Sequence, residues 1–494
     1  MILDEIAIQS SKLSYREKIG GLSRGKDKGR FIVENLNFKV MVGESVAILG
    51  ESGSGKSTIG KLLMQEIKPS EGNIFIRPDN ETNEEISEID RRLRLINLEL
   101  FEKYGKEADT GEDEERDALN SRYTEIAAES SIDNKKLRTG KNERWLIQMV
   151  PQNIFSALNP SQTPRESLVA KISKDLKLSK EEAQYRIDSL EREIGLRDET
   201  MLKKNKLLTS AEIQRVLLAM AICVEPDVII LDEFFTKLDQ HSVISLMDTI
   251  KTRMETKRMS CILLTSDPAL AVKFAERTYV LYKGSIIESG FTRELLSNPV
   301  HPYTKALKLS ASLDRQLISI PLIDKAYPLS DSRIRPSGCL FHRKCGVAMR
   351  NCGWSAEELV DLVKHAVEEQ KLLNNDALPD LESINVDSDE NLIEITFKKE
   401  KQYDESDIKT FMEKLFELKV QSHRGIIFES IKFIDFEQEH GNLVIQLMDP
   451  MRPFLIDISK TRKVACFQYP KTIEEIEEEL EKERTKEIRF FKDE

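Results

Sequence analysis

The sequence predicts an α/β fold with a mostly parallel sheet, and two observations support this prediction. Three short runs, Val228–Leu231, Cys261–Leu264 and Thr278–Leu281, are almost wholly apolar, as expected for strands that are buried on both faces. Segments of helical composition separate these runs, so the strands are connected by crossover helices. A further apolar run, Ser45–Leu49, leads directly into a glycine-rich loop. We therefore expect a helix-covered sheet that carries this loop.

Length and composition narrow the class of protein. With 494 residues the chain is long enough for two or more domains. Its net charge of −12 argues against a general affinity for nucleic acid. Nothing in it resembles a membrane span, and the first residues lack the pattern of a signal peptide. The six cysteines indicate thiols or metal ligands before disulfides, as is usual in the cytoplasm.

The glycine-rich loop reads Gly-Glu-Ser-Gly-Ser-Gly-Lys-Ser-Thr, which is the spacing of a phosphate-binding loop between a strand and a helix. Its glycines let successive backbone N–H groups point toward phosphate oxygens, and the helix that follows adds its positive end. The lysine can reach the β- and γ-phosphates, and the serine hydroxyl can bind Mg²⁺. The sequence therefore predicts a site for a nucleoside triphosphate, made of Gly50, Ser52, Gly53, Ser54, Gly55, Lys56, Ser57 and Thr58.

The segments on either side of this loop predict further strands. Residues 1–48 alternate apolar and polar side chains in short runs, which indicates antiparallel strands, and Gly72–Arg77 predicts one more. Tyr15 lies where its ring can stack on a purine base, although an ordinary strand aromatic explains it as well.

From residue 79 to 144 the composition becomes charged and helical. A heptad stripe begins there and predicts an inserted helical hairpin. This hairpin is either a solvent-exposed insertion without a binding role or, as we favour, a docking arm for a partner. The stripe consists of Ile86, Ile89, Leu93, Ile96 and Leu100.

The apolar run Val228–Leu231 ends in Asp232-Glu233, which is what a phosphate-binding loop requires opposite its lysine. We expect Asp232 to hold Mg²⁺ and Glu233 to polarise the water that attacks the γ-phosphate.

With this pair of motifs the chain resembles the ATP-binding subunits of ABC transporters over residues 1–310, apart from 79–144. The resemblance places Gln152 at the Q-loop, as a ligand of nucleotide and Mg²⁺, and Leu238-Asp239 at the D-loop. It also places the family's signature at residues 208–212, where a helix N-terminus caps the γ-phosphate of a partner's ATP. Those trans contacts would come from Thr209, Ser210, Ala211 and Glu212.

Two departures from the family pattern bear on activity. The signature normally reads Leu-Ser-Gly-Gly-Gln, but here the side chains of Ser210 and Ala211 obstruct close approach and Glu212 adds negative charge. The family has a switch histidine at the position of Ser266. A serine cannot bridge Glu233 and the γ-phosphate as an imidazole would. We therefore expect tight ATP binding and slow or absent ATP hydrolysis by this chain alone.

Residues 298–304 and 336–352 are similar to the C-terminal extension of the oligopeptide/dipeptide branch of this family. The extension contributes four thiols, and four thiolates suit either Zn²⁺ or an iron–sulfur cluster. The spacing is wider than in the usual zinc pairs and, with the resemblance, favours a [4Fe–4S] cluster; buried free thiols are the alternative. The thiols are Cys339, Cys345, Cys352 and Cys466.

The domain organisation follows from these segments. We predict an ABC nucleotide-binding domain over 1–310, including a helical subdomain, and a cysteine-rich domain made of 311–354 and 453–470. An α+β domain of order αββαββ is predicted over 355–452, with residues 426–436 as a strand, and a charged helical tail over 471–494.

The resemblance implies the ATP-binding subunit of an oligopeptide/dipeptide-type ABC importer, as the regulatory, weakly hydrolysing half of an ATPase pair. Such a subunit pairs head to tail with a second ABC ATPase, docks on membrane permeases around Gln152 and is peripheral on the cytoplasmic face of the membrane. The two insertions support an alternative, a soluble ABC protein that uses ATP-driven dimerisation to remodel or assemble a protein complex.

Overall fold

The structure is a computed structural model of the whole chain. It describes residues 5–18, 29–78, 84, 86, 88, 147–236, 238–311, 338–372, 381–388, 390–398, 405–417, 426–437, 441–448 and 452–469. These residues fall into two compact units. Unit 1 contains the described residues up to Pro299 together with Ser459–Lys463, and unit 2 contains Val300–Ile458 and the residues from Val464 onward. The four domain boundaries expected from the sequence remain predictions.

The larger sheet of unit 1 confirms the predicted α/β core. Its strands follow the order β9-β8-β3-β7-β6-β5, in which all neighbours are parallel except β8 and β9. Because helices cover the sheet, every residue of β3, β6 and β7 is buried. The strands are β3 (Ser45–Leu49), β5 (Ile147–Val150), β6 (Val228–Asp232), β7 (Ser260–Thr265), β8 (Arg277–Tyr282) and β9 (Ser285–Phe291).

A smaller antiparallel sheet of unit 1 has the order β2-β1-β4. Its strands are β1 (Ile6–Lys18), β2 (Gly29–Met41) and β4 (Glu71–Ile76). These strands confirm the prediction of antiparallel strands around the phosphate-binding loop.

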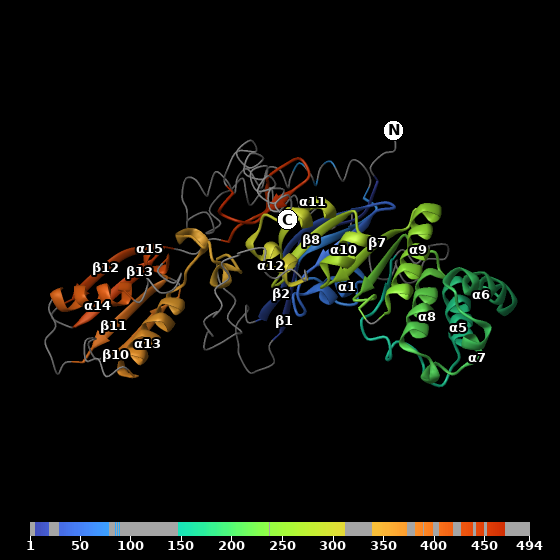
Figure 1. Cartoon of the computed structure of the whole chain (residues 1–494), viewed down its shortest axis with the longest axis horizontal. Helices are drawn as coiled ribbons and strands as arrows, with labels where there is room; N and C mark the ends of the chain where they lie inside the picture. The colour runs from blue at the N-terminus through green and yellow to red at the C-terminus, as the bar shows by residue number, and fades with distance from the viewer. Residues whose placement is uncertain are drawn as a thin grey trace, which may run out of the picture. The chain divides into compact units, whose positions relative to one another are not determined.

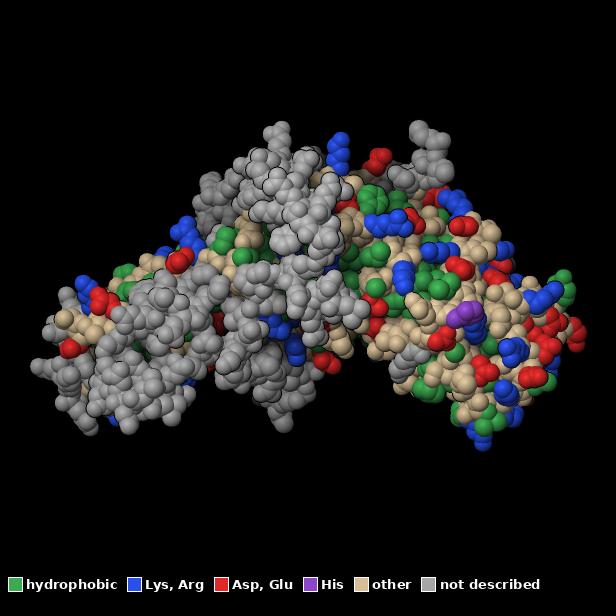
Figure 2. All heavy atoms as spheres, viewed as in Figure 1, with side chains coloured by type: hydrophobic (Ala, Val, Ile, Leu, Met, Phe, Trp, Pro, Cys, Tyr) green, Lys and Arg blue, Asp and Glu red, His purple; other side chains and the backbone are tan. Residues whose placement is uncertain are grey.

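The helices of unit 1 form two sets. One set follows strands of the larger sheet, and the other, α5 to α8, makes a group of its own beside α9 (Figure 1). Capping boxes start α5, α6 and α8, and Pro164 fixes the first turn of α5. On the face shown in Figure 2, acidic and basic side chains are interspersed over this group, with ion pairs such as Arg165–Glu191 at 2.6 Å.

The bounds of these helices are α1 (Lys56–Leu63), α5 (Pro164–Leu176), α6 (Lys180–Ile194), α7 (Asp198–Leu202), the 3₁₀ turn η2 (Asn205–Leu207), α8 (Ser210–Ile222), α9 (Gln240–Lys257), α10 (Pro268–Phe274) and α11 (Thr292–Ser297).

Unit 2 contains an antiparallel sheet of order β10-β11-β13-β12 with helices packed on one face. Burial alternates along β11 and β13, and Phe411 of α14 packs edge-on against Phe397 of β11. The elements are α12 (Pro302–Ala311), η3 (His342–Lys344), η4 (Arg350–Cys352), α13 (Ala356–Leu372), β10 (Leu381–Asp387), β11 (Leu392–Phe397), α14 (Glu405–Glu417), α15 (Ile426–Glu429), β12 (Ile431–Glu437) and β13 (Asn442–Leu447). Two short strands, β14 (Ile456–Asp457) and β15 (Lys463–Val464), follow.

The two hairpins of this sheet repeat one pattern. The central strands β11 and β13 pair with each other, and each bears three buried apolar residues in alternation. The turn before each central strand contains one residue in the left-handed region, Asn391 with φ 49° and Gly441 with φ 67°. The sheet of unit 2 is therefore built from two equivalent ββ hairpins, each preceded by a helix.

Two sequence expectations are affected. Residues 426–429 form the short helix α15, and the strand begins only at Ile431. The predicted strand over 426–436 is therefore wrong at its start, because a short apolar run in a sequence does not distinguish a helix from a strand. The hairpin expected over 79–144 lies outside the described residues, except for isolated positions that include the buried Ile86. Within the described residues, no helix combines the length and apolar character needed to cross a membrane.

Candidate nucleotide site

The phosphate-binding loop lies between the end of β3 and the start of α1. Its glycines are needed for two physical reasons. A Cβ on Gly50 would lie 2.3 Å from the Leu281 carbonyl oxygen, and Gly53 and Gly55 have φ angles of 80° and 106°. A side chain would therefore clash at Gly50, and it would strain the backbone at Gly53 and Gly55. The loop therefore has the backbone that cradling a phosphate requires.

Lys56 is the first residue of α1 and is 6% exposed. Its ammonium donates hydrogen bonds to the carbonyl oxygens of Gly50 (2.7 Å) and Glu51 (2.9 Å) and lies 3.3 Å from Glu233 Oε1. The ammonium is thus held by oxygen atoms at the centre of the loop. Phosphate oxygens are stronger acceptors than neutral carbonyls for such a group.

Asp232, at the end of β6, is buried and faces the Ser57 hydroxyl. Burial raises the pKa of its carboxyl above the ordinary value, with a further rise from neighbouring Glu233, against the lowering effects of the Ser57 hydrogen bond and Lys56. Asp232 Oδ1 has no hydrogen-bond partner within the described residues. A buried carboxylate oxygen without a donor, beside a serine hydroxyl, fits the oxygen ligands that Mg²⁺ prefers.

Glu233 follows β6 with a φ of 48°, and its N–H donates to the Leu264 carbonyl (2.9 Å), which ties it to β7. Its carboxylate makes three side-chain contacts. Oε1 lies beside Lys56, and Oε2 accepts from the hydroxyls of Thr236 (3.0 Å) and Ser266 (3.4 Å). The sequence analysis did not predict the contact between Ser266 and Glu233. Bridging to a γ-phosphate is a separate matter and stays as predicted.

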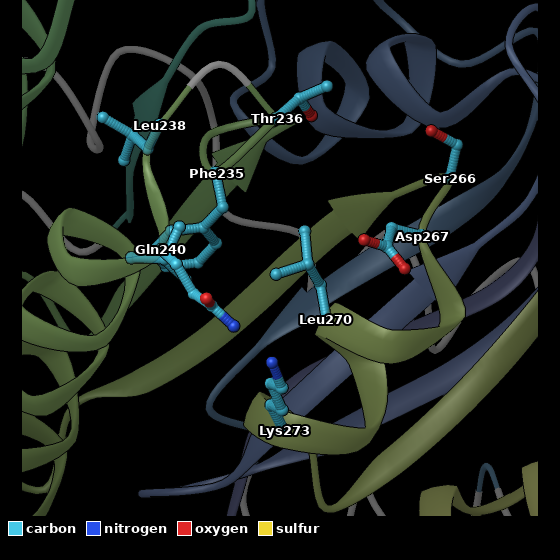
Figure 3. A pocket seen from close by; sticks show the side chains of 9 residues that line it. Phe235, Thr236, Leu238, Gln240, Ser266, Asp267, Leu270 and Lys273 are labelled. Atoms are coloured by element: carbon cyan, nitrogen blue, oxygen red, sulfur yellow. The ribbon is translucent and has the colours of Figure 1, made fainter. Parts of the chain in front are cut away.

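A cavity of about 280 Å³ lies beside Glu233, with Thr236 and Ser266 on its rim (Figure 3). Its apolar lining comes from the segment after β6 and from α9 and α10, and its polar lining comes from these same elements and from the segment after β7. The lining residues are Phe235, Thr236, Leu238, Gln240, Val243, Ser266, Asp267, Leu270 and Lys273.

Tyr15 and Gln152 lie apart from these contacts. Tyr15 pairs with Val33 across β1 and β2, as an ordinary strand residue would. Gln152 is exposed just after β5. Their roles toward a nucleotide stay predictions.

The signature segment starts α8, and a capping box closes this end of the helix. The Thr209 N–H (2.8 Å) and hydroxyl (2.9 Å) both donate to Glu212 Oε2, while the Glu212 N–H donates to the Thr209 hydroxyl. The Thr200 hydroxyl donates to Glu212 Oε1 (2.9 Å), and Lys203 lies 3.8 Å away. The N-terminus of α8 therefore already holds a carboxylate, where the positive end of a helix would otherwise attract an external anion.

The electrostatics of Glu212 agree with this geometry. Partial burial raises the pKa of its carboxyl, but the hydrogen bonds from Thr209 and Thr200 and the charge of Lys203 outweigh it, so that the pKa lies below its ordinary value. Gln214, on the same helix, donates to the Phe234 carbonyl (2.5 Å). Through this bond α8 is attached to the residue that follows Glu233.

The cysteine segment belongs to unit 2. Cys339, Cys345 and Cys352 are buried, and burial raises the pKa of the first two thiols to about 12. Backbone N–H groups oppose this effect, among them that of Met349, which donates to Cys352 Sγ at 3.3 Å. Cys339 lies close enough to Cys352 and Cys466 for the charge on any one to affect its pKa. Among the described residues, no group of three or more Cys, His, Asp or Glu converges as one metal ion would need.

His342 links this segment to α13. Its Nδ1 faces the Cys339 carbonyl (2.6 Å), and its Nε2 lies 2.9 Å from Glu358 Oε1. The imidazole ring thus links the Cys339 carbonyl to the Glu358 carboxylate. Burial raises the pKa of Glu358, but His342, Arg343 and the Ser355 N–H outweigh it and the pKa is lowered. A charged cluster thus fixes the cysteine loop on α13.

Together, a phosphate-binding loop after β3, an Asp-Glu pair at the end of β6 and a signature helix define a nucleotide-binding ATPase core. Two known families match the sequence. The ABC transporter family matches over residues 33–129 and 116–236, and the C-terminal region of the oligopeptide/dipeptide transporter family matches over residues 287–352.

The matches with individual relatives include most of the length of each relative. The dipeptide transport ATP-binding protein DppF of Haemophilus influenzae is 26% identical over 65% of this chain and 82% of its own. The oligopeptide transport ATP-binding protein AppF of Bacillus subtilis is 27% identical over 65% and 83%. The nickel import ATP-binding protein NikE of Escherichia coli O157:H7 is 30% identical over 58% and 88%. The chain belongs to the ATP-binding proteins of ABC transporters, of the oligopeptide/dipeptide type.

Sequence reasoning missed three contacts. Neither Thr236 nor Ser266 was expected to bind Glu233, and Thr200 was not expected to bind Glu212. The pattern Thr209-x-x-Glu212 could have revealed the capping box. The other contacts join residues whose proximity only the fold determines.

Proposed function

We propose that the chain is the ATP-binding subunit of a peptide-type ABC importer and the weakly hydrolysing member of an ATPase pair. The closed N-terminus of α8 carries this proposal. In a head-to-tail pair this helix end would face the γ-phosphate of the partner subunit's ATP, and the Glu212 carboxylate held there repels it. The chain's own half of the other site keeps Lys56, Asp232 and Glu233.

The reaction at this chain's own half follows from the contacts of its residues. The several negative charges of bound ATP draw the Lys56 ammonium from Glu233 and the loop carbonyls to the phosphates. Glu233 then takes a proton from the attacking water. The water oxygen bonds to the γ-phosphorus, the bond from that phosphorus to the bridging oxygen breaks, and ADP leaves with inorganic phosphate as the other product. Ser57 and Asp232 would hold Mg²⁺, which neutralises charge on the phosphates.

Repair of the signature tests this function. We expect the full chain to hydrolyse ATP slowly and the triple variant Ser210→Gly, Ala211→Gly, Glu212→Gln to turn over at least about tenfold faster, because donor groups directed at developing charge are worth that much or more. Two copies of the repaired chain can complete each other's sites. Adding Lys56→Ala to the triple variant is the control and removes the gain. Brisk ATPase activity of the unaltered chain alone would overturn the weak-hydrolysis proposal.

We further propose that the four cysteines of unit 2 hold a [4Fe–4S] cluster. The buried thiols lie near one another, and a backbone N–H directed at Cys352 Sγ stabilises a thiolate there. A four-iron cluster spans more space than one ion, so it does not require the convergence that a zinc ion would. The residues that would hold it are Cys339, Cys345, Cys352 and Cys466, and the group would supply a structural crosslink or a redox centre.

Iron analysis tests this cluster. Full chain purified without oxygen is expected to contain about four irons with matching acid-labile sulfide and broad visible absorbance. Cys352→Ser lowers the iron content, whereas Cys223→Ser, a change at a buried thiol of α8's C-terminal cap, does not. One zinc per chain and no iron would contradict the proposal.

A further inference from the structure

Glu233 lies in an asymmetric set of contacts. One carboxylate oxygen faces the Lys56 ammonium, and the other accepts from two hydroxyls. The two sides respond differently to ATP. Bound phosphates would attract the ammonium away from the carboxylate. The hydroxyls of Thr236 and Ser266, in contrast, donate to this carboxylate and would keep it as their acceptor.

The two hydroxyls approach Glu233 from separate elements. Thr236 lies three residues after Glu233 in the segment that follows β6, and Ser266 directly follows the end of β7. Figure 3 shows both side chains on the rim of the cavity, from separate segments. Two donors on separate segments restrict the carboxylate in two directions, which one donor would not do.

We propose that Thr236 and Ser266 form a two-hydroxyl clamp that positions Glu233 as the general base. The proposal deepens the proposed function and rests on it, since it concerns the same half-site. When Lys56 moves to the phosphates, Oε1 loses its ion pair and becomes available to accept a proton from water. The clamp keeps Oε2 fixed, so that Oε1 continues to face the loop that holds the phosphates.

The clamp explains how this half-site retains an oriented base although Ser266 stands at the switch position. A serine hydroxyl is short, and its 3.4 Å contact alone is a weak hydrogen bond. The Thr236 hydroxyl at 3.0 Å supplies the stronger restraint. Thr236 and Ser266 are thus positioning residues, because they act on the reaction through Glu233.

The test uses the full chain with the repaired signature described above, whose activity by itself reports on the proposed function. In that background Thr236→Val, which keeps the shape of the side chain and removes its hydroxyl, is expected to lower kcat about tenfold to a hundredfold, since a misplaced reacting group costs that much. KM for ATP does not rise, because the groups that bind the phosphates are unchanged. Ser266→Ala has a smaller effect in the same direction, and Thr236→Ser restores kcat.

A binding measurement makes the test independent of turnover. The unrepaired chain is titrated with ATP and with ADP in four forms: unaltered, Thr236→Val, Glu233→Ala and the double variant. Releasing the clamp lets the Glu233 carboxylate withdraw from the γ-phosphate, so Thr236→Val is expected to tighten ATP binding about threefold to tenfold. ADP affinity does not change, and the effect on ATP disappears once residue 233 is alanine.

The outcomes separate the two proposals. An inactive repaired chain that still shows the ATP-specific, Glu233-dependent change in affinity supports the clamp and overturns the signature explanation. An active repaired chain in which Thr236→Val alters neither kcat nor ATP affinity overturns the clamp. Equal changes in affinity with glutamate and alanine at residue 233 also overturn it, because Thr236 would then act on the fold and not through Glu233.

Discussion

Glu212 accepts hydrogen bonds from three donor groups of Thr209 and Thr200 at the start of α8, and Lys203 lies nearby. These interactions need the ionised carboxylate. Because they lower the pKa of Glu212 in the folded chain, ionised Glu212 stabilises the fold at pH values above its unfolded pKa, and this contribution is lost as the pH falls through the lowered folded pKa.

We predict a pH-dependent stability difference at this residue. At pH 7 Glu212→Gln lowers the free energy of unfolding by about 1 kcal/mol, the usual contribution of a capping interaction, and the difference from the unaltered chain shrinks below about pH 4. Denaturant unfolding followed by circular dichroism at pH 7 and pH 3.5 measures it. Glu181→Gln, at an exposed position in the first turn of α6, is the control. A difference that is constant with pH would contradict the prediction.

Residue identities in the nucleotide site follow from motif spacing, but their partners do not. The spacing of the loop identifies Lys56, and the strand-ending Asp-Glu pair identifies Asp232 and Glu233 as candidates. The contacts of Thr236 and Ser266 with Glu233 depend on how the ends of β6 and β7 lie together. Sequence spacing contains no information about such a meeting point.

At the scale of elements, Asn391 holds the turn of one hairpin. It has a φ of 49°, is 3% exposed, and its side chain accepts from the Ala356 N–H (2.7 Å) and donates to the carbonyls of Trp354 (3.1 Å) and Met448 (2.8 Å). We predict that Asn391→Ala destabilises the fold by about 2–4 kcal/mol, since it removes the partners of three backbone groups, of which those of Trp354 and Ala356 are buried, and strains the backbone.

The equivalent turn supplies the matched control. Gly441 also has a positive φ, and a Cβ there would meet only the Phe397 carbonyl oxygen, at 3.9 Å. Gly441→Asn should therefore cost under about 1 kcal/mol, because asparagine tolerates this conformation. Thermal unfolding of both variants tests the pair, and equal destabilisation would show that the side-chain bonds of Asn391 contribute little.

In unit 2, the prediction of strands succeeds where apolar and polar residues alternate and fails at one place where they do not. The alternation along residues 392–397 and 443–447 indicates half-buried strands, and both form. Residues 426–436 lack that alternation at their start, and the first turn is α15. The capping box of α8 closes a helix end that the family's pattern leaves open, and only the structure shows how completely Glu212 is engaged.

At the scale of the whole molecule, unit 1 carries exposed apolar side chains near the Q-loop. Phe155, Leu202 and Leu207 are 61%, 71% and 65% exposed, and Asn205 donates to the Asn159 carbonyl (2.8 Å), which ties their two segments together. We expect them to contact the permease. Phe155→Ser should weaken binding to membrane vesicles that contain the permease about tenfold, as for an apolar interface anchor.

The control for this experiment is Phe291→Ser, since Phe291 is a comparable exposed aromatic, 48% accessible, at the end of β9. Both variants must retain ATP binding. Equal loss of vesicle binding in both, or no loss in Phe155→Ser, would contradict a docking role for this surface.

The sequence predicts the α/β core and its nucleotide loop because buried parallel strands leave a strong apolar signal. It does not predict which residues cluster into units: the contacts assign Ser459–Lys463, near the end of the chain, to unit 1. There Arg462, 1% exposed, donates to buried Glu288 at 2.8 Å. Such long-range pairs connect segments that no local pattern relates.

The hydrogen bonds of Asn391 also indicate how the gene for this chain could have gained a segment during evolution. Its amide nitrogen donates to both Trp354 and Met448, so the carbonyl before α13 and the carbonyl after β13 are held by one atom. The two ends of the segment from Trp354 to Met448, which contains the helices and the sheet of unit 2, therefore lie next to each other. A gene could therefore gain or lose that segment in one step, with a linker of a few residues closing the gap and the flanking cysteines left in order.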